Sequence, residues 1–284
     1  MPDPIYRLLQ RSELDTLIDW AAAEGWNPGL HDADAFRTTD SNAFVGIEQD
    51  GQLIGGGAIV SYAEELGFMG LFIVRPDHRR QGLGRKFWIW RRDQLRARLH
   101  PGASIAMDGV FAMQPFYAEG GFVFTHRNLR MAGTGQPAPR NPRLIDLATI
   151  PFTAVAAYDL KHFLAPRRAF LEKWIRPAGG LALGFMRDDH LTGCGIIRPC
   201  RNGFKIGPLF ADTPEFAETL FTALSAHAAG QPLFLDTPEN NPAALALAAR
   251  HGLKESFGCA RMVLGPIPPT PWPSIYGVTT FELG

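Results

Sequence analysis

The segment with the clearest chemical potential is a glycine-containing loop between an apolar run and a helical pattern. The apolar run is Leu71 to Val74, and the loop is an Arg-x-x-Gly-x-Gly sequence over residues 79–84. Such a loop presents successive backbone N–H groups at a helix N-terminus, where unpaired amides and the helix dipole favour an anion. Its glycines lack the Cβ atoms that would block a phosphate. The segment therefore predicts a pyrophosphate-binding loop.

The residues on either side of this loop predict a domain of mixed α and β structure. The turn over residues 49–52, Gln-Asp-Gly-Gln, lies between two apolar runs and indicates a β-hairpin. Apolar residues at helical spacing, with Ser12 as an N-cap, indicate the first helix. The expected elements are a helix over 12–25, strands over 43–48, 53–61 and 66–74, a helix over 83–99, a strand over 104–111, a short helix over 115–120 and a strand over 122–131.

The pattern of the first half recurs in the second. Residues 68–72 (Phe-Met-Gly-Leu-Phe) resemble residues 204–210 (Phe-Lys-Ile-Gly-Pro-Leu-Phe), and late in each half a Gly-Phe or Gly-Leu pair follows a short helix. Between the halves, residues 133–143 have the composition of a linker. A repeat this long indicates two copies of one domain, which we place at 1–132 and 144–284.

The second copy lacks the anion-binding loop. The corresponding segment, residues 210–219, contains no glycine, and its acidic residues would repel a phosphate. Asp212 or Thr213 is expected only to cap a helix, with Pro214 at the first helical position. Only the first copy is therefore expected to bind a pyrophosphate.

The order of these elements and motifs resembles the GCN5-related N-acetyltransferase (GNAT) superfamily, and in particular its tandem form with a divergent second GNAT domain. Residues 71–87 and the run Tyr117-Ala-Glu-Gly-Gly-Phe122 carry the likeness, which extends over essentially the whole chain. It implies the mixed-sheet α/β fold of acyl-CoA N-acyltransferases, present twice.

The resemblance also implies an acetyl-CoA site in the first domain. Phe72, Ile73 and Val74 would offer backbone groups to the pantetheine arm. Tyr117 occupies the position of the family's usual general acid, which protonates the leaving thiolate. The residues that would bind the pyrophosphate are Arg79, Arg80, Gln81, Gly82, Leu83, Gly84 and Arg85.

Two positions depart from the family pattern. Many GNAT domains have an asparagine seven residues before the tyrosine, whereas this chain has Val110, and Gln114 is the candidate to replace part of its hydrogen bonding. In the second half Asn241 is present, but Ala248 stands at the tyrosine position. Without the loop and the acid, the second domain is not expected to transfer an acyl group.

The acceptor side of the site is less well specified by the sequence. The amine must lose a proton, and Asp108 is the first candidate for the base, with Glu64 and Glu65 behind it. Asp108 could instead stabilise a bulge, the two glutamates could lie in a solvated turn, and ordered water could serve as base. Trp26 and Asn27 fall where GNAT enzymes form one wall of the acceptor pocket, although both could simply pack within a loop.

Composition and charge exclude other classes of function. The 28 basic and 28 acidic residues give zero net charge, and the arginines that follow the loop, among them Arg91, fit the solvated face of a helix, so nucleic acid is not an expected partner. The three cysteines and eight histidines have no metal-ligand spacing, and no apolar run approaches the roughly 20 residues of a membrane helix. We expect a cytoplasmic protein that has neither a metal nor a membrane partner.

Together these features predict an acetyl-CoA-dependent N-acetyltransferase that acts on a primary amine of a small molecule, by direct attack of the amine on the thioester. Two alternatives stay open. One is a non-catalytic acyl-CoA-binding or sensing protein, because the usual asparagine is missing; the other is a transferase that uses a longer acyl-CoA. A homodimer is compatible with the sequence.

Overall fold

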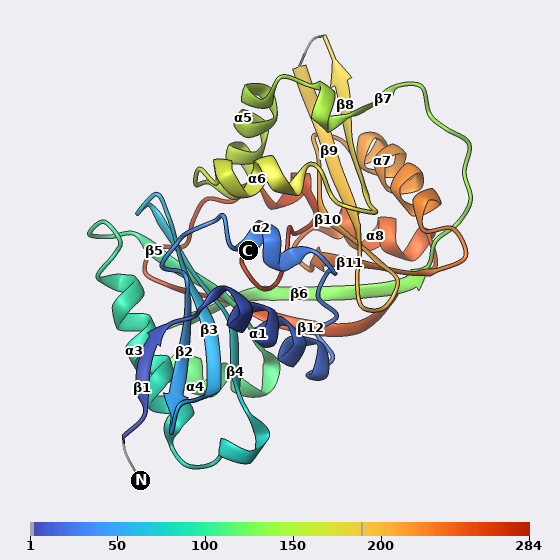
Figure 1. Ribbon diagram of the computed structural model, residues 1–284. Helices are drawn as coiled ribbons and strands as arrows, with labels where there is room; N and C mark the ends of the chain where they lie inside the picture. Colours follow the sequence, from blue (N-terminus) through green and yellow to red (C-terminus); the bar gives the residue numbers. More distant parts are fainter. Residues whose placement is uncertain (1–2, 189) are drawn as a thin grey trace.

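The computed structural model describes residues 3–188 and 190–284, and the 13 strands within them form one continuous sheet (Figure 1). Neighbouring residues of a strand point to opposite faces, and the packing follows this rule. Phe68 joins the hydrophobic cluster that contains α1 residues such as Leu17, whereas Met69 joins the cluster that contains Phe87 of α3. The first helix and the loop-bearing helix therefore cover opposite faces of the same strands.

The first half follows the order expected from the sequence, with two short additions, β1 and α2. The helix α1 begins after Gln10, not Ser12, because the Gln10 amide donates to Glu13 in a capping box. Its elements are β1 (Ile5–Leu8), α1 (Arg11–Ala23), α2 (Asp32–Phe36), β2 (Phe44–Gln49), β3 (Gln52–Tyr62), β4 (Leu66–Val74), α3 (Leu83–Arg96), β5 (Ser104–Val110), α4 (Gln114–Glu119) and β6 (Val123–Thr134).

The second half repeats this plan, so two copies of one fold are present. Its helix α7 begins as expected, with the Thr213 side chain accepting from the Phe216 amide and Pro214 at the first helical position. The elements are β7 (Leu144–Asp146), α5 (Phe152–Phe163), α6 (Arg168–Trp174), β8 (Leu181–Arg187), β9 (His190–Pro199), β10 (Phe204–Ala211), α7 (Pro214–His227), β11 (Pro232–Pro238), α8 (Pro242–Arg250), β12 (Lys254–Leu264) and β13 (Ile275–Gly277).

The two halves exchange strands. The sheet order is β1-β2-β3-β4-β5-β12-β6-β11-β10-β9-β8-β7, so β12 of the second half pairs with β5 of the first, while β6 of the first half pairs with β11 of the second. Gly133 and Thr134, assigned to the linker from composition, belong instead to β6 and pair with Leu233 and Pro232. Backbone hydrogen bonds of each half are thus completed by the other.

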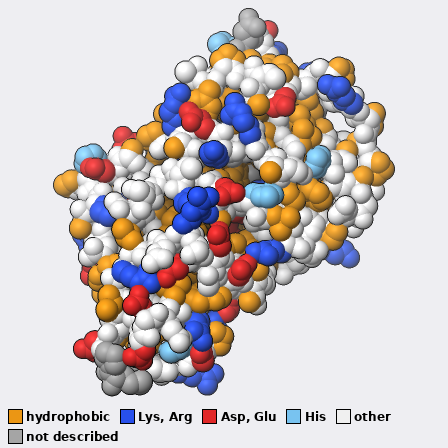
Figure 2. Space-filling view, in the orientation of Figure 1, with side chains coloured by type: hydrophobic (Ala, Val, Ile, Leu, Met, Phe, Trp, Pro, Cys, Tyr) orange, Lys and Arg blue, Asp and Glu red, His pale blue; other side chains and the backbone are white. Residues whose placement is uncertain are grey.

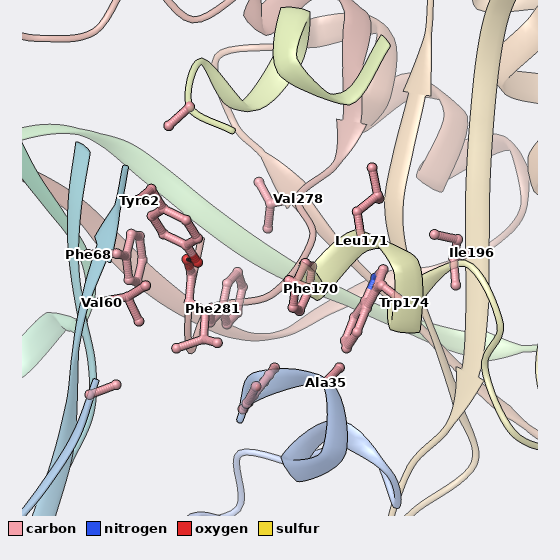
Figure 3. Close-up of a cluster of buried hydrophobic side chains, with 14 of the residues drawn as sticks. Ala35, Val60, Tyr62, Phe68, Phe170, Leu171, Trp174, Ile196, Val278 and Phe281 are labelled. Carbon is pink, nitrogen blue, oxygen red and sulfur yellow. Dashed lines mark hydrogen bonds between the residues drawn. The ribbon is translucent and has the colours of Figure 1, made fainter. Parts of the chain in front are cut away.

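A shared hydrophobic core reinforces this exchange. Figure 3 shows Val60, Tyr62 and Phe68 from the first half approached by Phe170 and Trp174 of α6, with Phe281 of the C-terminal segment between them. The rings of Phe36 in α2 and Trp174 also stack across the halves, with 6.2 Å between centroids. The segment that follows β13 therefore lies inside the core that joins the two halves.

Deletion of residues 144–284 is expected to abolish cooperative folding of the remainder. The deletion removes β12, which lies between β5 and β6, and uncovers the shared core. An edge left unpaired and an apolar face left open both favour aggregation. Size-exclusion chromatography and thermal denaturation measure the effect. A soluble, monomeric fragment with a sharp unfolding transition would contradict the interlocked fold.

Candidate active site

The cleft forms where two parallel strands stop pairing. β4 and β5 pair over Leu66–Met69 and Ser104–Met107, but both strands continue past this register. Leu71 has a φ of +50°, which is unusual for a branched residue in a strand and marks a bulge in β4. Beyond this point the strand ends line a cleft of about 410 Å³. The edge of β4 that no longer pairs with β5 can therefore bind an extended ligand instead of a neighbouring strand.

A buried arginine supports the bulge. Arg91 of α3 is fully buried, although the sequence places it on a solvated helix face, and its Nη2 donates to the carbonyls of Ala58 (2.5 Å) and Gly70 (2.7 Å). A Cβ at Gly57 of β3 would collide with this guanidinium, so the absence of a side chain there makes room for it. Burial lowers the pKa of Arg91 to about 9. The guanidinium thus holds β4 in its bulged form beside the cleft.

The glycine loop opens onto the same cleft. Gly82 precedes α3 with a left-handed φ of +77°, and Arg80 also has a positive φ of +63°. Among the described residues, the backbone amides from Arg80 to Arg85 donate no hydrogen bond to a backbone carbonyl of the loop or the helix cap. Gly84 lines the cleft, and a Cβ there would meet only Phe72 and Val74, at 3.5 and 3.7 Å. The loop therefore offers unpaired amides and no obstructing side chain, as an anion requires.

The arginines of the loop have different surroundings. Arg79 donates to the Val74 carbonyl (2.7 Å) and pairs with Glu24, while Arg85 pairs with Glu119 at 2.7 Å. Arg80 has no ion pair within the described part of the chain. All three arginines line the cleft. On the face of the molecule seen in Figure 2, basic and acidic side chains are interspersed, so no large patch of one charge forms there.

Tyr117 projects from α4 into the cleft. Its side chain is buried, and it packs against Trp88 of α3 with 5.8 Å between ring centroids. A Cβ at Gly109 would collide with the tyrosine ring, which explains the glycine at that position of β5. Burial raises the pKa of Tyr117 to about 12. The hydroxyl therefore carries its proton throughout the neutral range, as a general acid must.

Asp108 lies at the cleft but is held by other side chains. Arg261 of β12 donates to both carboxylate oxygens, at 2.8 and 2.6 Å, and Asn128 of β6 donates to Oδ1 at 2.8 Å. Burial raises the pKa of Asp108, although these two partners act in the opposite direction. Because both oxygens already accept hydrogen bonds, the geometry favours a role in joining β5, β12 and β6 over that of a base.

The other candidates divide between cleft and surroundings. Trp26 lines the cleft, and its carbonyl accepts from Arg130 at 2.6 Å. Asn27 instead bonds to the backbone of Asn202 through both ends of its amide. Most of the expected cofactor residues line the cleft, namely Phe72, Ile73, Val74, Arg79, Arg80, Gly84 and Arg85. The expected cofactor residues outside its lining are Gln81, Gly82, Leu83 and Gln114. The alternative bases Glu64 and Glu65 also lie outside it.

Four cleft residues come from the second half, where no motif indicates them. They are Phe257 and Cys259 of β12 and Phe281 and Glu282 of the C-terminal segment. They reach the cleft because β12 replaces β6 beside β5 and because the C-terminal segment packs against Gly70. Burial raises the pKa of Cys259 well above its ordinary value, so the thiol stays protonated.

In the second half the chain itself fills the equivalent opening. β10 and β11 pair in parallel over Phe204–Ile206 and Leu233–Leu235, and then β13 pairs with Leu209 and Phe210 of β10. A strand of the protein thus lies where β4 leaves its backbone free. Among the described residues, no group of three or more His, Cys, Asp or Glu side chains could hold a metal ion, and every helix is too short or too polar to cross a bilayer.

Comparisons with known proteins agree with this geometry. Residues 4–122 match the acetyltransferase (GNAT) family and residues 155–277 match an acetyltransferase (GNAT) domain. The chain is 26% identical to a holothin acyltransferase of Pseudoalteromonas sp. (strain SANK 73390), over 96% of this chain and 92% of that protein.

Solved structures show the same fold. A putative acetyltransferase from Pyrococcus horikoshii has a TM-score of 0.84 at 22% identity, covering 100% of this chain and 97% of that one. A tandem GNAT protein from the clavulanic acid biosynthesis pathway has a TM-score of 0.64 at 14% identity, covering 94% and 100%. The cleft, the repeat and the matches to both halves lead to one conclusion: the chain is an acyltransferase of the GNAT superfamily with two GNAT domains.

Proposed function

We propose that the protein is an acetyl-CoA-dependent N-acetyltransferase for a primary amine of a small molecule. The observation that carries the proposal is that Arg80, Gly84 and Arg85 of the loop, whose amides have no backbone partner among the described residues, line the same cleft as the buried side chain of Tyr117. The loop and its arginines would bind the pyrophosphate, and the backbone of Phe72–Val74, which β5 leaves unpaired, would bind the pantetheine arm. This placement directs the thioester toward Tyr117.

The proposed reaction is a direct transfer. The neutral amine nitrogen forms a bond to the thioester carbonyl carbon, the C–S bond breaks, and Tyr117 gives its proton to the thiolate. The proton released by the amine returns the phenol to its starting state, directly or through water. The similarity to a holothin acyltransferase supports an amine nitrogen as the acceptor.

The test is an assay for free thiol released from acetyl-CoA in the presence of a panel of primary amines that includes holothin. Amine-dependent thiol release with formation of the N-acetylated product supports the proposal. Binding of acetyl-CoA without turnover of any amine would contradict it. A parallel series with longer acyl-CoAs identifies the donor, and faster turnover with a longer chain would replace acetyl-CoA in the proposal.

Cys259→Ala is expected to retain most of the turnover, even though Cys259 lines the cleft. A covalent acyl-enzyme would need a thiolate, and burial keeps this thiol protonated. Steady-state rates and mass spectrometry of the protein mixed with acetyl-CoA measure the effect, with Cys194→Ala as a control for a buried cysteine outside the cleft. A two-step transfer would be favoured if turnover were lost only in the Cys259 variant and the parent protein became acetylated.

A further inference from the structure

One carboxylate in the cleft has no hydrogen-bond donor among the described residues. The side chain belongs to Glu282, which is only 3% exposed, and its Oε2 is buried without a partner. Glu282 lines the same cleft as Tyr117. Burial of an ionisable oxygen without a donor is costly, so native proteins rarely leave one in this state unless water, an ion or a ligand completes it.

The backbone that carries Glu282 is held from both halves of the chain. Tyr62 of β3 donates its hydroxyl to the Leu283 carbonyl at 2.8 Å, and the Leu283 amide donates to Thr280 at 2.9 Å. A Cβ at Gly70 would collide with the Glu282 carbonyl, so the segment packs directly on β4 beside the bulge. The fold therefore fixes the backbone that carries this carboxylate beside β4.

Two buried arginines whose charges interact with Glu282 already form hydrogen bonds to other carboxylates. Arg130 donates to both oxygens of Asp236, at 2.7 and 2.8 Å, and Arg198 donates to Asp32, at 2.8 and 3.3 Å. Burial alone would lower the pKa of Arg130, but Asp236 and, more weakly, Glu282 outweigh it and raise that pKa. Glu282 thus has cationic surroundings, but neither arginine donates to it.

The walls beside this carboxylate are aromatic. Phe257 and Phe281 line the cleft with Glu282, and the Arg130 guanidinium lies over their rings at 5.6 and 5.0 Å from the centroids. Trp26 contributes a third aromatic side chain. A site with one unpaired carboxylate and aromatic walls recognises a small cation with an apolar body, because rings attract both apolar surface and positive charge.

We propose that Glu282 is the residue that binds the acceptor, and that the acceptor class is an apolar primary amine whose ammonium group donates to the Glu282 carboxylate. The bound ammonium then loses one proton, directly or through water, to give the neutral amine that attacks the thioester. The inference rests on the proposed N-acetyltransferase function. It adds that the second domain supplies the acceptor-recognition group through its C-terminal segment, while the first domain supplies the CoA loop and Tyr117. Strand exchange and the course of this segment bring the two sets into one cleft.

The test uses 2-phenylethylamine as the probe and 2-phenylethanol as its uncharged analogue, titrated calorimetrically into the full-length protein with CoA present. The parent protein is expected to bind the amine at least about 10-fold more tightly than the alcohol, since a charge-assisted hydrogen bond is lost with the alcohol. Glu282→Gln is expected to remove that preference without changing CoA affinity. Glu239→Gln, at a glutamate bound to Arg127 outside the cleft, is the matched control and is expected to keep it.

Equal affinity of the parent protein for amine and alcohol, or no binding of the amine, would overturn the inference without any variant. An unchanged preference in Glu282→Gln would do the same. If Glu282→Gln fails to fold, Glu282→Asp retains the charge and is expected to keep the preference; loss of it in a folded Asp variant counts against the inference. Charge-selective binding without thiol release from acetyl-CoA for any amine of the panel would contradict the proposed function alone. Turnover with an unchanged acceptor KM in Glu282→Gln would contradict the role of Glu282 alone.

Discussion

Replacement of Gly84 by aspartate is expected to weaken CoA binding by roughly 100-fold while leaving the fold intact. A Cβ at this position meets only ordinary contacts with Phe72 and Val74, so the backbone tolerates the change. The new carboxylate, however, would face the bound pyrophosphate. Like charges about 4–5 Å apart near a protein surface repel by about 3 kcal/mol, which corresponds to roughly 100-fold weaker binding. Calorimetric titration with CoA measures the loss, and thermal denaturation checks the fold.

A matched pair of glycines separates this charge effect from backbone strain. Gly82, before α3, and Gly51, in the β2–β3 turn, have φ values of +77° and +73°, and a Cβ at either position would have no neighbouring atom within 4 Å. Aspartate at either site therefore carries the same conformational cost. Only Gly82→Asp is expected to weaken CoA binding. Equal CoA affinities for the two variants would refute the assignment of the loop.

Tyr117→Phe is expected to reduce kcat by about 100-fold, a typical contribution of a positioned general acid. CoA affinity is expected to stay close to that of the parent protein, because the ring still packs against Trp88 and above Gly109. Since burial raises the pKa of Tyr117 to about 12, the phenol stays protonated as the pH rises. The parent rate should therefore show no decline due to this group below about pH 11.

The control for this variant is Tyr6→Phe. Tyr6 also packs against α3, with its ring 5.3 Å from that of Phe87, but it lies outside the cleft. Steady-state kinetics with CoA titration distinguish the two tyrosines. A Tyr117→Phe variant that loses CoA affinity and keeps its kcat would show that the residue is structural.

Much of the fold was predictable because it depends on local patterns. The β-hairpin turn, the strand over residues 66–74 and the start of α3 follow from short-range residue preferences, and the structure confirms them. The repeat was predictable because each copy repeats the same pattern of strands and helices. Arg91 shows the limit of such reasoning. Its position on a charged helix predicts exposure, but Gly57 on a neighbouring strand makes room for its burial.

The sequence by itself determined which residues form the proposed cofactor side of the site. The loop amides, its glycines and Tyr117 lie within one domain and follow local signals that a single chain displays. Only the tertiary structure decided the acceptor side. The partners of Asp108, and the presence of Phe257, Phe281 and Glu282 in the cleft, depend on the exchange of β6 and β12 and on the course of the C-terminal segment. Contacts between residues more than a hundred positions apart arise from strand pairing and core packing, which local spacing does not encode.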